Sequence, residues 1–151
     1  MKNSKREKKH LLIIGGTGFI GYHCLNFAKK YRWKLTSISR NNPRKNRKVT
    51  GVTYLKLNIN NQYQLNSKLK KNFTYVINLA GSSNQVLSKK KINNTHYEAA
   101  KKIMNLFSEK KINKFIQVGS AAEYGSKNNS HKENTTCLPY SRYGRSKLAA
   151  T

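Results

Sequence analysis

The sequence contains no aspartate and few acidic residues of any kind. Five glutamates stand against 31 lysine and arginine residues, so the formal net charge is +26. A charge of this size repels itself in a compact fold and attracts polyanions. Two interpretations stay open. One is a nucleic-acid partner, and the other is a bias of the coding sequence, because lysine far outnumbers arginine and asparagine is abundant.

The basic residues are spread along the chain in pairs and triplets. Lys29-Lys30, Lys70-Lys71 and Lys89-Lys90-Lys91 fall in different segments. Neither a DNA-recognition helix nor a row of interleaved aromatic and basic residues is evident in the sequence. This distribution favours the compositional bias and speaks against a nucleic-acid partner, which stays open as an alternative function.

Cysteine is nearly absent, and so are long apolar runs. Cys24 and Cys137 are the only cysteines and belong to no cluster of metal ligands, which excludes a disulfide framework and predicts no metal site. A reducing cytoplasm suits such a chain. The run Leu11–Ile14 is too short for the core of a signal peptide, and no run is long enough to span a membrane. We expect a cytoplasmic protein with no membrane partner.

Segments with the hydrophobic periods of strands and helices alternate from residue 10 onward, which predicts a parallel sheet covered on both faces. The fold class is therefore α/β, a Rossmann-like doubly wound sheet of about five strands over residues 10–151. It is incomplete, since a full Rossmann sheet has at least one more strand. Residues 1–9 are predicted to be a basic, disordered N-terminus. The predicted strands are His10–Ile14, Lys34–Ser39, Val52–Leu57, Thr74–Ala80 and Lys114–Gly119. The predicted helices are Phe19–Tyr31, with Ile20, Cys24, Phe27 and Ala28 on its apolar face, Gln62–Lys71, Ile92–Glu109 and one that starts at Ser141.

Three glycines lie at fixed spacing between the first predicted strand and the first helix. Gly15 permits a tight turn, Gly18 lets the backbone approach a pyrophosphate, and Gly21 lets the helix pack closely on the sheet. The helix N-terminus offers free N–H groups to the phosphates. The segment predicts an NAD(P)-binding domain. A strand-to-helix turn that uses glycine for its geometry alone is the other interpretation.

The absence of acidic residues matters at Ser39-Arg40, where the second predicted strand ends. Sites that prefer NAD usually carry Asp or Glu here to bond the ribose 2′-hydroxyl, whereas an arginine nearby accommodates the 2′-phosphate of NADP. No acid lies within reach, and Arg40 stands where that phosphate would lie. We therefore predict NADP, with NAD as the alternative. An arginine that is merely solvated in a basic loop stays possible.

A tyrosine and a lysine four residues apart begin the last predicted helix. Tyr143 and Lys147 would share one face of it, where a lysine ammonium stabilises a phenolate and so prepares the tyrosine for acid-base work. Ser120 ends the fifth predicted strand, at the sheet edge where α/β folds bind ligands. Its hydroxyl is placed to hold a substrate oxygen that Tyr143 protonates.

Taken together, these motifs resemble the extended short-chain dehydrogenases/reductases. More narrowly, they resemble the N-terminal part of the NAD(P)-dependent epimerase/dehydratase family, which modifies nucleotide-activated sugars. The resemblance covers residues 10–151. The matching segments are GGTGFIG at Gly15–Gly21, INLAG at Ile77–Gly81, GSAAEYG at Gly119–Gly125, the spacing of Glu133, Pro139 and Tyr143, and YGRSKLAAT at Tyr143–Thr151.

The resemblance implies a set of site residues and a nucleotide-diphosphate sugar as substrate. The implied catalytic residues are Ser120, Tyr143 and Lys147. The implied cofactor-binding residues are Gly15, Thr17, Gly18, Phe19, Ile20 and Gly21 for the pyrophosphate, Asn58 and Ile59 beside the adenine, Leu79, Ala80 and Gly81 along the cofactor, and Arg40, Tyr143 and Lys147. The implied substrate contacts are Ser82, Ser120 and Glu123.

Two positions depart from the family pattern. The family usually has Asp where this chain has Asn58, so the adenine contact is expected to weaken, because an amide also presents an NH₂ group. The family usually has Asn where this chain has His96, which puts its proton relay in question. A helix residue under no catalytic demand is the other interpretation of His96.

The residues after Ser120 reduce the number of family reactions that this chain is expected to carry out. Sugar 4,6-dehydratases of the family carry acidic residues where this chain has Ala121 and Ala122, and Glu123 comes one position later. Dehydration is therefore disfavoured. A nucleotide-sugar epimerase and a 4-keto reductase stay open, with hydride transfer by NAD(P) and Tyr143 as acid-base.

The family's substrate lobe and last strands follow the YxxxK helix, and this sequence holds neither. We expect either a fragment or a natural truncation, with weak or no turnover by itself. A homodimer through the long helix and the YxxxK helix is possible in the family. The alternative function is a truncated or degenerate dinucleotide-binding module without turnover.

Overall fold

The computed structural model describes residues 8–69, 72–82, 88–126 and 130–151. Five strands form one sheet in the order β3-β2-β1-β4-β5, and every pairing is parallel. This confirms the predicted Rossmann-like α/β class. Most of the predicted N-terminal segment 1–9 lies outside the described residues. The strands are β1 (His10–Ile14), β2 (Lys34–Ser39), β3 (Val52–Lys56), β4 (Tyr75–Asn78) and β5 (Lys114–Gln117).

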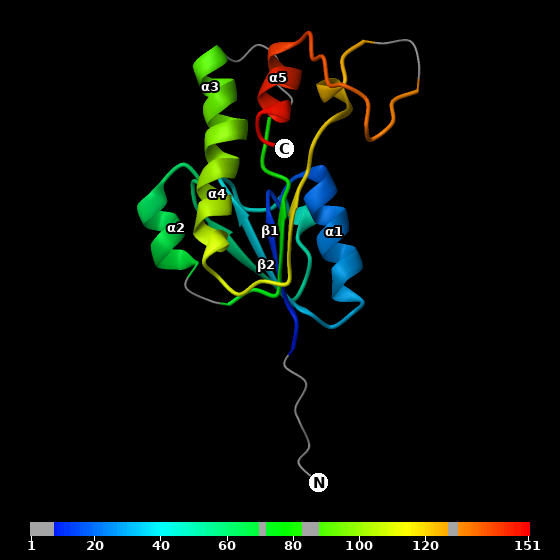
Figure 1. The fold of residues 1–151 in the computed structure, drawn as a ribbon. Coiled ribbons are helices and arrows are strands. Elements are labelled where there is room, and N and C mark those ends of the chain that lie inside the picture. The colour runs from blue at the N-terminus through cyan, green and yellow to red at the C-terminus, as the bar shows by residue number, and fades with distance from the viewer. Residues whose placement is uncertain (1–7, 70–71, 83–87, 127–129) are drawn as a thin grey trace.

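Helices cover both faces of the sheet, in the layered arrangement expected for parallel strands. In Figure 1, α1 lies on one side, and α2 and α4 lie on the other; α5 sits above the carboxyl ends of the strands. The helices are α1 (Phe19–Lys29), α2 (Gln62–Lys68), α3 (Lys89–Asn93), α4 (Ala99–Ser108) and α5 (Arg142–Leu148), with short turns η1 (Lys45–Arg47), η2 (Asn94–Glu98) and η3 (Ala121–Glu123).

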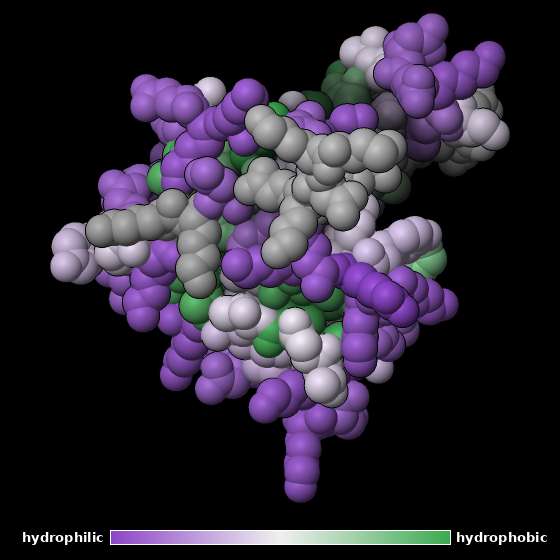
Figure 2. Space-filling model, turned by 90° about the horizontal axis from the view of Figure 1, so that it is seen from below, coloured by the Kyte–Doolittle hydropathy of each residue, from purple (hydrophilic) through white to green (hydrophobic). Residues whose placement is uncertain are grey.

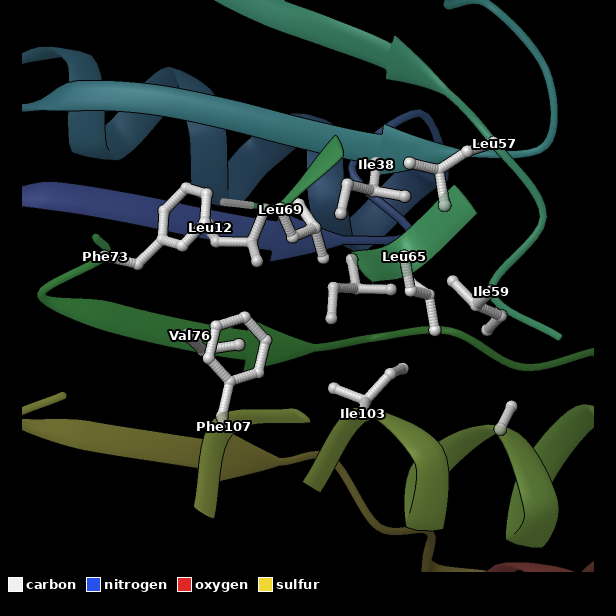
Figure 3. Close-up of a cluster of buried hydrophobic side chains, with 12 residues drawn as sticks. Leu12, Ile38, Leu57, Ile59, Leu65, Leu69, Phe73, Val76, Ile103 and Phe107 are labelled. Atoms are coloured by element: carbon white, nitrogen blue, oxygen red, sulfur yellow. The ribbon is translucent and has the colours of Figure 1, made fainter. Parts of the chain in front are cut away.

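The core has two parts because β1 is buried on both faces. Leu12 and Ile14 point into the larger cluster, between the sheet and the helices α2 and α4, and Leu65 and Ile103 reach it from those helices (Figure 3). Leu11 and the other members of the smaller cluster lie under α1. The buried apolar surface is the main source of stability for the fold.

The structure corrects several predicted boundaries. The long helix begins at Lys89 and is interrupted by the π-helical turn η2. The predicted strand Thr74–Ala80 pairs only over β4, so the chain is already a loop from Leu79 onward. On α1 the buried residues are Gly21, Leu25 and Ala28. The predicted face was wrong for two residues, because Ile20 and Phe27 are each 57% exposed.

Hydrophilic side chains are prominent on the surface (Figure 2). Figure 2, which views the molecule from below, shows hydrophilic residues over most of that face, with smaller hydrophobic areas between them. Among the described residues, no helix is long and apolar enough to cross a membrane.

Candidate functional site

A groove of about 270 Å³ opens at the carboxyl ends of the strands, where the loops after β1, β2, β3 and β4 meet. The strand order reverses between β1 and β4, which is where α/β sheets bind ligands. The groove brings together most of the predicted cofactor residues, and adds Ser39, Asn41, Asn60 and Thr95. Those predicted residues are Gly15, Thr17, Gly18, Arg40, Asn58, Ile59, Leu79, Ala80 and Gly81.

The glycines after β1 are needed for close backbone packing. Gly15 has a φ of +88°, and a Cβ there would lie 3.0 Å from the backbone of Leu79. At Gly21 a Cβ would overlap the Gly15 carbonyl oxygen and the Gly16 Cα. A side chain at Gly15 would therefore press on the loop after β4, and one at Gly21 would push α1 away from the glycine turn.

The N-terminus of α1 presents backbone amides at this turn. Within the helix, the first amide seen to donate is that of Tyr22, to the Gly18 carbonyl at 2.9 Å. The amides of Phe19, Ile20 and Gly21 precede it and have no intrahelical acceptor, so they can bind an anion. The side chains of Phe19 and Ile20 do not line the groove and are 64% and 57% exposed, so any contact with a pyrophosphate would come from their backbone.

Arg40 is exposed and lines the groove at the end of β2. The turn beneath it is fixed by Ser39, whose Oγ accepts the Thr17 amide at 3.2 Å and donates to the Ile38 carbonyl at 2.7 Å. Arg40 is therefore next to a turn that ties β2 to the glycine segment. A guanidinium here meets whatever anion occupies this end of the groove.

Asn58 lies in the loop after β3, on the far side of the groove. Its Oδ1 accepts the Asn60 amide at 3.1 Å, and its own amide donates to Gln64 Oε1 at 3.1 Å. The acceptor oxygen that the family's Asp would also supply is thus used to shape the loop. Ile59 beside it is buried.

The predicted catalytic residues lie on the same edge of the sheet, on α5 and η3. Ser141 caps α5 by accepting the Gly144 amide at 2.9 Å. A Cβ at Gly144 would overlap the Ala122 carbonyl oxygen, so α5 packs tightly on η3. Tyr143 is half-buried, whereas the Lys147 side chain is buried and its Nζ donates to the Val118 carbonyl at 2.5 Å.

Burial lowers the pKa of Lys147, and the nearby Glu123 carboxylate opposes this effect. Glu123 itself is buried. Its Oε1 accepts the Ser120 amide at 2.6 Å, and its Oε2 accepts the Thr151 hydroxyl at 2.9 Å. Both carboxylate oxygens are therefore used within the protein. Within the described residues Glu123 caps η3 and holds Ser120, and its contact with substrate stays a prediction.

His96 is more constrained than a helix residue under no demand, because it is buried and hydrogen-bonded on both ring nitrogens. Nδ1 lies 2.7 Å from Ser146 Oγ, and Nε2 lies 3.0 Å from the Ser82 amide nitrogen. Burial is the main cause that lowers the pKa of His96, and the charge of Lys147 adds to it.

Among the described residues, no group of three or more His, Cys, Asp or Glu side chains could hold a metal ion.

One surface feature was not predicted from the sequence: aromatic side chains pair along α1 and in the turn after it, with cations from that turn and from η1 close to them. Phe19 packs edge-on against His23, and Phe27 against Tyr31, at ring-centroid distances of 4.7 and 5.4 Å. Cations lie over this row: Arg47 is 5.7 Å from the Phe19 ring, and Lys30 is 5.8 Å from the Phe27 ring. The residues recur every four positions, which separates them in sequence but aligns them on the helix surface.

The fold is shared with several enzymes of known structure. The Campylobacter jejuni UDP-Glc/GlcNAc 4-epimerase matches with a TM-score of 0.86 at 20% identity, over 94% of this chain and 46% of that enzyme. The Helicobacter pylori ADP-L-glycero-D-manno-heptose-6-epimerase matches with a TM-score of 0.86 at 25% identity, over 95% and 49%. The Bordetella bronchiseptica enzyme WbmG, solved in complex with NAD, matches with a TM-score of 0.85 at 16% identity, over 99% and 50%.

The chain thus spans about half the length of the solved structures that it matches. No curated protein sequence gives a match to it. The model of the NAD dependent epimerase/dehydratase family matches residues 11–151, which include the glycine turn, the groove and α5. The expected family is confirmed: the chain belongs to the NAD dependent epimerase/dehydratase family.

Proposed function

We propose that residues 10–151 form the dinucleotide-binding half of a nucleotide-sugar epimerase or 4-keto reductase. The observation that carries the proposal is the groove at the sheet edge, which gathers the glycine turn, Arg40 and the loop after β4, close to the edge where α5 lies. The named activities of the solved neighbours, a UDP-Glc/GlcNAc 4-epimerase and a heptose-6-epimerase, support a sugar nucleotide as substrate.

The residues present suit a dinucleotide. The glycine turn lines the groove at Gly15, Thr17 and Gly18, and its close packing depends on the absence of side chains at Gly15 and Gly21. When bound, the dinucleotide would supply the hydride chemistry: in an epimerase it would take a hydride from the sugar and return it, and in a 4-keto reductase its reduced form would give a hydride to the keto carbon and become oxidised. Tyr143 would exchange a proton with the sugar oxygen, and Ser120 would hold that oxygen by a hydrogen bond.

Lys147 would support Tyr143 electrostatically, since a buried ammonium near the phenol favours its ionised form. Its bond to the Val118 carbonyl fixes the ammonium at the end of β5. An epimerase or reductase needs no further acid or base beyond Tyr143. The alanines at 121 and 122, and the engagement of Glu123 within the protein, support these reactions over a dehydration.

Arg40 makes NADP the cofactor that we propose, with NAD as the alternative. Arg40→Ala is expected to weaken NADP binding about tenfold and to leave NAD binding unchanged, because a charged hydrogen bond contributes about 1.5–3 kcal/mol. Isothermal titration of the chain with each dinucleotide measures both affinities. Arg44→Ala is the matched control, since Arg44 is exposed in the following loop but does not line the groove.

An equal loss of NAD and NADP affinity in Arg40→Ala would contradict the assignment of Arg40 to the 2′-phosphate. Binding of both dinucleotides with no oxidation of any nucleotide sugar, even with a substrate lobe supplied, would favour the binding-only module.

A second candidate function is binding of single-stranded nucleic acid on α1. The aromatic and basic row supports it, because stacked bases and phosphates are recognised by such side chains. No acidic residue occurs between Lys8 and Tyr97, so nothing in this half of the sequence repels a polyanion.

The salt dependence of nucleic-acid affinity distinguishes this candidate function from the dinucleotide-binding function. If α1 binds single-stranded nucleic acid, affinity for an oligothymidylate should fall about 10³-fold between about 50 and 200 mM salt. Phe27→Ala should weaken it further, while Tyr63→Ala, at an aromatic residue 81% exposed on α2, should not. The absence of binding at low salt, measured by fluorescence anisotropy, would eliminate this function.

A further inference from the structure

His96 lies in a π-helical turn, η2, between α3 and α4. Short π-helical turns are uncommon and often occur at functional sites. Here the wider turn carries a side chain that is only 3% exposed and that touches two other parts of the chain. One is the loop after β4, at Ser82, and the other is α5, at Ser146.

The hydrogen bonds define which tautomer His96 adopts. Ser146 Oγ donates its proton to the Tyr143 carbonyl at 2.8 Å, so it can only accept from His96 Nδ1, at 2.7 Å. The neutral ring therefore carries its proton on Nδ1. Nε2 is then free to accept the Ser82 amide at 3.0 Å. A continuous chain of donors runs from Ser82 through His96 and Ser146 to the backbone of Tyr143.

This chain of bonds joins the groove to the α5 residue assigned to proton transfer. Gly81, directly before Ser82, lines the groove, and a Cβ on it would lie 3.4 Å from the His96 ring. The ring also stands edge-on to Tyr143, at 5.4 Å between centroids and an interplanar angle of 88°. The His96 imidazole thus contacts both the loop after β4 and α5.

We propose that neutral His96 is a positioning residue that holds the loop of Gly81 and Ser82, and with it the bound dinucleotide, in register with Tyr143. The inference rests on the proposed function, because it assigns the groove to a dinucleotide. The described contacts of His96 are with Ser82, Ser146 and the Tyr143 ring, so we assign it a positioning role that it exerts through these residues.

Protonation would break the arrangement at one identified bond. A proton on Nε2 removes the acceptor that the Ser82 amide uses, and the new N–H faces the Ser82 carbonyl, 3.1 Å away, a contact that favours the protonated ring. Among the described residues, the charged group that acts on the ring is Lys147 of α5, which opposes a second positive charge; Tyr143, Ser146 and Ser82 are its polar or aromatic neighbours. The bond from the Ser82 amide to the ring would therefore be lost as pH falls.

The direction of the stability change follows from the lowered pKa of His96. The unfolded chain binds the proton with the ordinary pKa of 6.5, and the folded chain binds it less readily. Folding stability is thus unaffected well above that value and falls as pH decreases below it.

Two amide variants separate the two contacts of the ring. His96→Gln places an acceptor near the former Nε2 and is expected to keep the Ser82 bond. His96→Asn is shorter, keeps a donor near the former Nδ1, and is expected to lose the Ser82 bond. As pH falls, the affinity of the wild-type chain for NADP should decrease about tenfold more than the affinity of His96→Gln. At high pH, His96→Asn should bind NADP about tenfold more weakly than the wild-type chain does. His23→Gln, at an exposed histidine of α1, should keep the wild-type pH profile.

A second measurement is independent of any ligand. The Ser82 amide resonance, followed by ¹H–¹⁵N NMR of the chain alone, should shift as His96 titrates and should not shift in His96→Gln. A Ser82 resonance that shifts neither with pH nor in either variant would overturn the proposal. If the wild-type chain binds no dinucleotide at any pH, the proposed function fails, whereas the NMR titration still decides whether His96 positions the loop.

Discussion

Replacing Gly21 with alanine is expected to destabilise the chain by about 3 kcal/mol and to abolish dinucleotide binding. In an open helix this substitution would stabilise, because alanine is the better helix former by about 1 kcal/mol. Here the added methyl group would overlap the Gly15 carbonyl oxygen and the Gly16 Cα, which are backbone atoms of the glycine turn. Backbone must therefore move, and such overpacking costs about 1–3 kcal/mol or more.

Thermal unfolding followed by circular dichroism measures the effect, which corresponds to a fall in Tm of about 10 °C. Titration with NADP at a temperature where the variant is still folded measures the loss of binding. The matched control is Gly51→Ala. Gly51, unlike Gly21, has a positive φ, +84°, but no atom lies within 4 Å of its added Cβ, so only the backbone strain of about 1–2 kcal/mol applies and binding is kept. A Gly21→Ala protein as stable as wild type would show that α1 does not need this close approach.

Local sequence patterns were enough to predict the fold and the glycine turn at the edge of the groove. The five strands were found because each is a short segment with the hydrophobic pattern of a strand, apolar in Leu11–Ile14 and alternating in Lys34–Ser39. The glycine turn was found because its geometry depends on residues within seven positions of one another. Arg40 was found because it is the residue directly after β2, and the end of β2 at Ser39 was predicted correctly.

The features that were missed depend on contacts between distant segments. The helical period of the sequence placed Phe27 on the apolar face of α1. In the structure Leu25 is the α1 residue that is completely buried against the sheet, and Phe27 is exposed. The hydrogen bonds of Glu123 to Ser120 and Thr151 were not predicted, and Thr151 lies 28 residues away from Glu123. Nothing in the sequence signals that His96 meets Ser146 across 50 residues. Thr95 lines the groove from the π-helical turn, which was not predicted either.

Replacing Tyr143 with phenylalanine is expected to lower turnover about a thousandfold while dinucleotide binding stays at the wild-type level. The substitution removes one hydroxyl and keeps the ring, so the edge-on contact with His96 and the packing of α5 should persist. The hydroxyl is the group that we assign to proton transfer at the sugar, and loss of a positioned acid-base group typically costs about 10²–10⁴-fold in rate. The variant therefore separates chemistry from binding.

Turnover is measured with the chain joined to the C-terminal half of the Helicobacter pylori epimerase, because the chain covers 49% of that enzyme. Sugar nucleotides are the substrates, and conversion is followed by chromatography. Tyr140→Phe is the matched control, since Tyr140 lies just before α5 and is 72% exposed. It removes the same hydroxyl from a neighbouring tyrosine and should leave both turnover and binding intact. Normal turnover in Tyr143→Phe would remove Tyr143 from proton transfer. A parallel loss of dinucleotide affinity would instead assign its hydroxyl to holding the cofactor, since binding and chemistry would then depend on the same bond.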